Sequence, residues 1–95
     1  MLKIQKAEYI GDYKILLAFN NGHTGTVNLE ETIQNDNRAI FLRIKDKNFF
    51  RSFTITHNAI SWFDELDVAP EYLFYLAFTG NSEFHEQFRE WGYTS

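Results

Sequence analysis

The sequence has no cysteine, a single proline and no long apolar run. Without cysteine the chain has no disulfides and no thiolate metal site, so packing alone must hold the fold. No window approaches the roughly 18 apolar residues that a membrane-spanning helix needs. The charged residues 1–14 also lack the apolar core of a signal peptide. We therefore expect a cytoplasmic protein.

Aromatic residues, in contrast, are abundant. The 95 residues include 10 Phe, 5 Tyr and 2 Trp, a composition that favours a compact core or an interface over disorder. A chain of this length is one domain with one core.

Charge is divided along the chain. Residues 64–90 carry seven acidic side chains and one basic side chain, and the net charge of −4 weighs against sequence-independent binding to polyanions. Residues 38–51 form a basic segment with one acidic side chain, and aromatic residues that suit stacking on nucleic-acid bases are interleaved there. The favoured interpretation of this basic segment is a solvated face, and the alternative is a surface that binds an acidic protein or nucleic acid. Its basic residues are Arg38, Arg43, Lys45, Lys47 and Arg51.

The first half of the chain predicts an edge strand over 2–9 and a hairpin. Alternation over 13–19 indicates a strand with one buried face. A three-residue turn with Gly22 in the left-handed conformation brings Ile15 opposite Val27, so that apolar side chains coincide. Asn28 then suits the start of a short helix.

The segment after residue 38 returns to the core, and Asp46 is expected to cap one helical turn over 47–51. A second hairpin follows over 53–62, in which a two-residue turn at 57–58 sets Ile55 opposite Ile60 and places Trp62 on the core face.

Pro70 suits the first position of a helix over 70–79. Of the acidic residues before it, Asp67 is expected to accept backbone donors at the start of this helix. The helix is apolar on nearly every side and therefore needs two neighbours.

The tail, residues 81–95, repeats aromatic side chains at helical spacing. The amphipathic segment 82–91 is short and needs docking, either on the helix over 70–79 or on a second subunit. The candidate interface residues are Tyr72, Tyr75, Phe78, Phe84, Phe88 and Trp91.

Catalytic and metal signatures are weak. His23, His57 and His85 have no ligand partner at a recognised metal spacing, and turn or surface positions explain them better. We expect no metal, no cofactor and no enzymatic activity.

Several segments together resemble the DUF 2442 family, a bacterial domain of unknown function. Trp62, Asp67 and the run Ala69-Pro70-Glu71 are the most specific part. Phe63 stands where the family usually has proline, and the tail is an extension. The resemblance rests on residues 13–19 with Gly22, 53–55, 60–62 and 67–73.

The resemblance implies a two-layer α+β fold of order β-β-β-α-β-β-α, with an antiparallel sheet of two hairpins plus an N-terminal strand. We expect residues 1–80 to form this domain and the C-terminal amphipathic helix to follow. Family members also occur alongside another small protein, in arrangements suspected to be toxin–antitoxin pairs. The favoured function is a non-enzymatic protein-interaction module that forms a homodimer. The alternative is a nucleic-acid-binding regulator that uses residues 38–51, and an enzyme ranks third.

Overall fold

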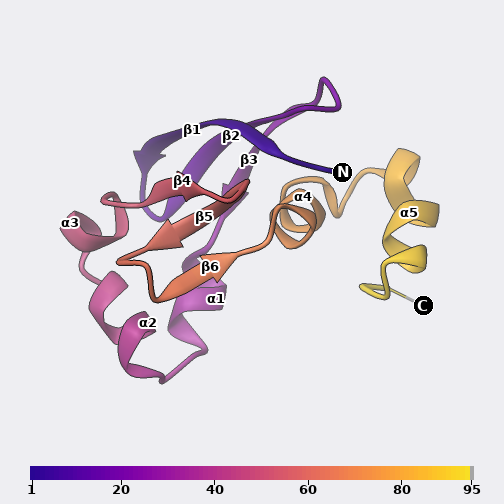
Figure 1. Ribbon diagram of the computed structural model, residues 1–95. Coiled ribbons are helices and arrows are strands. Elements are labelled where there is room, and N and C mark those ends of the chain that lie inside the picture. Colours follow the sequence, from indigo (N-terminus) through magenta and orange to yellow (C-terminus); the bar gives the residue numbers. More distant parts are fainter. Residues whose placement is uncertain (95) are drawn as a thin grey trace.

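The computed structural model describes residues 1–94 and has the predicted α+β fold. It contains two three-stranded antiparallel sheets, ordered β1-β2-β3 and β4-β5-β6 (Figure 1). The strands are β1 (Ile4–Gly11), β2 (Lys14–Phe19), β3 (Thr24–Asn28), β4 (Thr54–Thr56), β5 (Ala59–Trp62) and β6 (Leu66–Val68). The helices are α1 (Glu30–Gln34), α2 (Ala39–Ile44), α3 (Lys47–Phe50), α4 (Pro70–Phe78), the 3₁₀ helix η1 (Ser82–Phe84) and α5 (His85–Glu90).

The first sheet has the register that the apolar pattern predicts. Ile15 lies opposite Val27, and Leu17 lies opposite Gly25. Gly22 has a φ of +88°, which confirms the left-handed turn residue. The side chains of Ile15, Leu17, Phe19 and Val27 therefore share one face and are buried there.

The second hairpin is also confirmed. Ile55 lies opposite Ile60, and the turn residues His57 and Asn58 have φ values of +52° and +67°. Both are in the left-handed region that a two-residue hairpin turn requires. Trp62 is buried on the core face, as expected.

Strand β6 is an element that the sequence did not reveal, because the acidic segment after Trp62 lacks the usual signal of a hairpin turn. Phe63 and Asp64 occupy this turn with φ values of +57° and +55°. The N–H of Glu65 closes it by donating to the carbonyl of Trp62 at 3.0 Å, and Leu66 then pairs with Trp62. Asparagine and glycine normally mark such turns, and neither is present here.

The start of α4 contains one confirmed prediction and one wrong prediction. Pro70 is the first residue of the helix, as expected. No side chain caps α4, however, and Asp67 lies exposed in β6 opposite Ser61. Strand pairing keeps the backbone extended as far as Val68, so the carboxylate of Asp67 does not reach the helix amides. The predicted cap of α3 is confirmed, since Asp46 accepts from the N–H of Asn48. Asn28 accepts from the N–H of Glu30, but α1 begins one residue later than expected and its N-cap residue is Leu29.

Helix α4 has the two neighbours that its apolar surface predicts. On one side it packs on β3, where a Cβ atom added to Gly25 would lie 2.7 Å from the ring of Phe78. On the other side Phe74 contacts Phe84 and Phe88 of the tail, with ring centroids 4.9 and 6.0 Å apart. The tail is thus part of the same core.

Candidate interaction surface

Two exposed phenylalanines and an arginine meet at the end of the molecule formed by α2, α3 and the β5–β6 turn. The side chains of Phe49 and Phe63 are 46% and 37% exposed, and their rings contact edge to face with centroids 5.9 Å apart. The guanidinium carbon of Arg43 lies 4.1 Å from the centroid of the Phe63 ring. We call Arg43, Phe49 and Phe63 the aromatic–arginine patch.

Phe63 adopts an unfavourable backbone conformation within this patch. Its φ of +57° lies in the left-handed region, which costs a residue with a Cβ atom on the order of 1 kcal/mol. Burial does not offset this cost fully, because the ring stays partly in solvent. Backbone strain of this kind is concentrated at functional sites.

Buried side chains directly beneath the patch hold it rigid. Phe50, which follows Phe49, is fully buried. The indole N–H of Trp62, which precedes Phe63, donates to the carbonyl of Phe50 at 2.7 Å. The residues next to Phe49 and Phe63 in the chain are therefore joined by a buried hydrogen bond, which holds the two exposed rings in place before binding.

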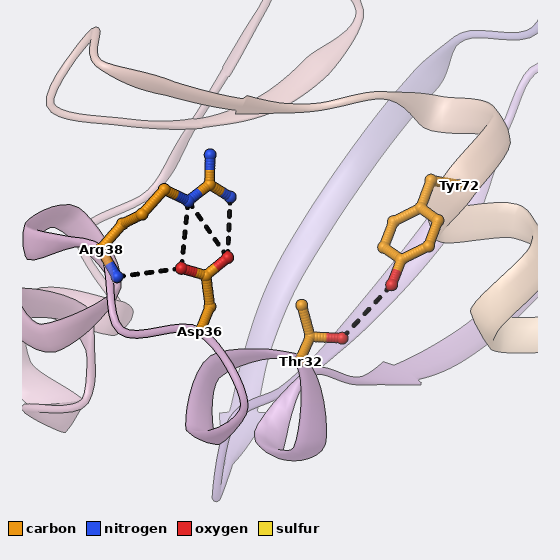
Figure 2. Close-up of polar contacts among 4 residues, drawn as sticks. All are labelled: Thr32, Asp36, Arg38 and Tyr72. Carbon is orange, nitrogen blue, oxygen red and sulfur yellow. Dashed lines mark hydrogen bonds and ion pairs between the residues drawn. The ribbon is translucent and has the colours of Figure 1, made fainter.

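The basic segment is largely neutralised by nearby carboxylates. The ion pairs that it forms within residues 1–94 are open to solvent on at least one side, so they add little stability. Hydrogen bonding to Arg38 lowers the pKa of Asp36 (Figure 2), and hydrogen bonding to Lys47 lowers that of Asp12. The pairs are Arg38–Asp36 at 2.8 Å, Arg43–Glu65 at 3.4 Å and Lys47–Asp12 at 3.0 Å.

The two other basic residues of the segment lie at the same end of the molecule. The guanidinium carbon of Arg51 is 5.5 Å from the centroid of the Tyr9 ring. Lys45 is half-buried, and its backbone carbonyl accepts from the hydroxyl of Tyr13. Three of the five basic residues are therefore paired with carboxylates, whereas Lys45 and Arg51 form no ion pair within residues 1–94.

The family described as "Protein of unknown function (DUF2442)" matches residues 4–79. The chain belongs to the DUF2442 family. The match includes both sheets, α4 and the aromatic–arginine patch of this DUF2442 protein, and it ends before the tail. Among curated proteins, none matches the sequence.

A solved structure shares the fold of this DUF2442 protein. It is a protein of Nitrosomonas europaea that is described as a suspected DNA-binding protein, with a TM-score of 0.75 and 15% sequence identity. The similarity covers 100% of this chain, including the tail, and 63% of that chain. The DUF2442 chain thus spans less than two thirds of that protein, and an identity this low shows a common fold alone.

The predicted interface residues of the tail region are used largely within the DUF2442 chain itself. Phe84 and Phe88 are buried, whereas Tyr72, Tyr75, Phe78 and Trp91 are half-buried. The hydroxyl of Tyr72 lies 3.4 Å from that of Thr32 in α1 (Figure 2).

The sequence interpretation missed Tyr93, whose ring stacks on Tyr75 with centroids 4.9 Å apart. Gly92 ends α5 with a φ of +85°, and the N–H of Tyr93 donates to the carbonyl of Phe88 at 3.0 Å. This arrangement is a Schellman motif, which folds the residue after the glycine back onto the helix. Burial, followed by the charge of Glu71, raises the pKa of Tyr93. The glycine after Trp91 was the available signal.

The part of the chain that the structure describes contains no group of three His, Asp or Glu side chains that could hold a metal ion. Nor does it contain a helix long and apolar enough to cross a membrane.

The ring of His23 packs edge-on against the ring of Phe84, with centroids 4.9 Å apart. A hollow of about 670 Å³ lies over the outer face of the first sheet, with Lys6, Glu8 and Leu16 in its lining.

Proposed function

We propose that this protein is a non-enzymatic protein-interaction module, that it forms a homodimer, and that it binds through the aromatic–arginine patch. The observation that carries the proposal is Phe63, a large aromatic side chain that is held exposed in a strained turn. Aromatic residues and arginine are the types that contribute most to binding at interface centres. A preorganised patch also loses little conformational entropy on binding.

The substitution Phe63→Gly tests this proposal directly. Glycine adopts positive φ without strain, so the variant should keep its thermal stability or gain up to about 1 kcal/mol. It should nevertheless lose self-association. A side chain with a purely structural role would give the opposite result on stability.

Light scattering at tens of micromolar measures the association. The wild-type protein should have about twice the mass of the 11.3 kDa chain, and Phe63→Gly should be monomeric. Ile10→Ala removes another exposed apolar side chain, 47% exposed on β1, and should remain dimeric. A monomeric wild-type protein would contradict the homodimer, and a dimeric Phe63→Gly would contradict the role of the patch.

A second small protein is the heterologous partner to which the family resemblance points. Affinity capture from the native cell should compare wild-type and Phe63→Gly baits. A protein that the wild-type bait retains and the variant loses supports binding through the patch. Equal capture by both baits contradicts it.

Nucleic-acid binding is the second candidate, favoured by the basic segment and by the description of the Nitrosomonas europaea protein. Binding to the promoter DNA of its own gene should then weaken steeply with salt. Arg43→Glu and Lys45→Glu should abolish it. An absence of binding at low salt would exclude this function.

A further inference from the structure

We propose that the aromatic–arginine patch of one chain docks on the acidic tail helix α5 of a second copy. The two chains then pair antiparallel about a two-fold axis. This inference rests on the proposed function, because it names the surface that the patch meets. Its support comes from charge, from the chemistry of the tail and from the placement of the two surfaces.

The tail carboxylates lie at the end of the molecule opposite Arg43. Of the acidic segment 64–90, Asp64, Glu65 and Asp67 lie in the β5–β6 turn and β6, whereas Glu83, Glu86 and Glu90 lie in η1 and α5. The basic segment 38–51 forms α2 and α3. Figure 1 shows α2 and α3 at one end of the molecule and α5 at the other end. Arg43 and the tail carboxylates of one chain are therefore too far apart to meet within one molecule.

The exposed side of η1 and α5 offers carboxylates. Glu86 is paired with Arg89 at 2.5 Å. Glu83 and Glu90 are exposed and form no ion pair within the described residues 1–94. The guanidinium of Arg43 is a donor that matches these two carboxylates.

Arg43 is available for a new carboxylate. Its contact with Glu65 is long at 3.4 Å, and the two side chains are 48% and 58% exposed. The guanidinium has five N–H donors in a planar fork that suits bidentate binding of a carboxylate. A glutamate of the second copy can therefore replace or join Glu65 without exposing a buried charge.

A two-fold axis uses both complementary ends twice. The molecule is elongated, 35 × 26 × 22 Å. When two copies lie side by side in opposite directions, each patch faces the partner's α5, and the assembly closes as a dimer. Two equivalent contacts then contribute to one association constant.

A charge exchange between the two surfaces tests this pairing. Variant one is Arg43→Glu, and variant two combines Glu83→Arg with Glu90→Arg. Alone, each variant should self-associate at least about tenfold more weakly than the wild type, because like charges meet at both contacts. An equimolar mixture should regain wild-type affinity as a heterodimer, since both contacts again join opposite charges. Glu8 is an exposed residue of β1, and Glu8→Arg is the matched control that should not change association.

The outcomes separate this inference from the proposed function. If the wild type is dimeric and neither variant weakens it, the docking on α5 is wrong while the homodimer stands. If both variants dissociate but their mixture stays monomeric, the two surfaces do not meet each other. If the wild type is monomeric, the proposed homodimer fails first. Circular dichroism melts establish that each variant is folded.

Discussion

Gly25 marks the closest approach between α4 and the first sheet. A methyl group at this position would lie 2.7 Å from the Cζ atom of Phe78 and 3.0 Å from its Cε1. The ring cannot retreat freely, because it also packs on Phe74 and Phe84. The absence of a side chain at position 25 is therefore required for the packing of the helix.

We predict that Gly25→Ala lowers the free energy of unfolding by about 1–3 kcal/mol through overpacking. Urea denaturation measures this change. Gly80→Ala is the matched control, because no atom lies within 4 Å of its added Cβ, and its stability should be nearly unchanged. Equal effects of the two substitutions would show that Phe78 yields to the methyl group.

Some residue roles could be predicted from the sequence because they depend on local chemistry. Gly22 and Pro70 have backbone preferences that hold in any fold, and the structure confirms both. The prediction that Asp67 caps α4 was wrong, because pairing with Ser61 of β5 fixes the backbone of Asp67 in a strand. The patch was missed as a unit because Phe63 is distant in sequence from Arg43 and Phe49.

At the scale of elements, the tail is held on α4 by the aromatic side chains of Phe84, Phe88, Trp91 and Tyr93. Phe88 is 2% exposed and contacts both Phe74 and Tyr75 of α4. Its removal would leave a cavity between the two helices. The tail should therefore behave as part of the core.

We predict that Phe88→Ala costs about 3–5 kcal/mol of stability. Phe49→Ala is the matched control, because it removes the same atoms from a ring that is 46% exposed; it should cost less than about 1 kcal/mol. Thermal and urea unfolding of both variants measure the difference. A small effect of Phe88→Ala would mean that the tail does not stabilise the domain.

Elements with a clear period could be predicted, and those without one could not. In the strands over 13–19 and 59–62, apolar side chains lie opposite apolar side chains of the paired strand. The apolar surface of α4 required two neighbours. Strand β6 has only three residues and follows a turn without asparagine or glycine. The sequence also left open whether the tail docks within the chain, since an aromatic stripe shows that a helix is covered without showing by what.

For the whole molecule, the division of charge was visible in the sequence, but the fold alone shows that Glu83, Glu86 and Glu90 lie at the end opposite Arg43, whereas Asp64 and Glu65 lie near it. Electrostatic attraction between exposed charges is screened by salt. An interface held by apolar contacts alone would keep or gain affinity. Ionic strength therefore distinguishes the two kinds of dimer.

We predict that the dissociation constant of the homodimer rises severalfold when sodium chloride is raised from about 50 to about 500 mM. Sedimentation equilibrium at both concentrations measures it. Arg43→Glu, in which like charges meet, should show the opposite dependence, because salt screens the repulsion and tightens the association. A wild-type dimer that tightens with salt would contradict the electrostatic contact.

The hydrogen bond between the indole of Trp62 and the carbonyl of Phe50 has a further, practical consequence. This indole lies beneath the proposed docking surface, between the backbones that carry its two exposed rings. The chain has two tryptophans, so Trp91→Phe would leave Trp62 as the single indole fluorophore. The fluorescence emission of Trp62 should then change when a partner binds at the patch, so binding can be measured without an added label.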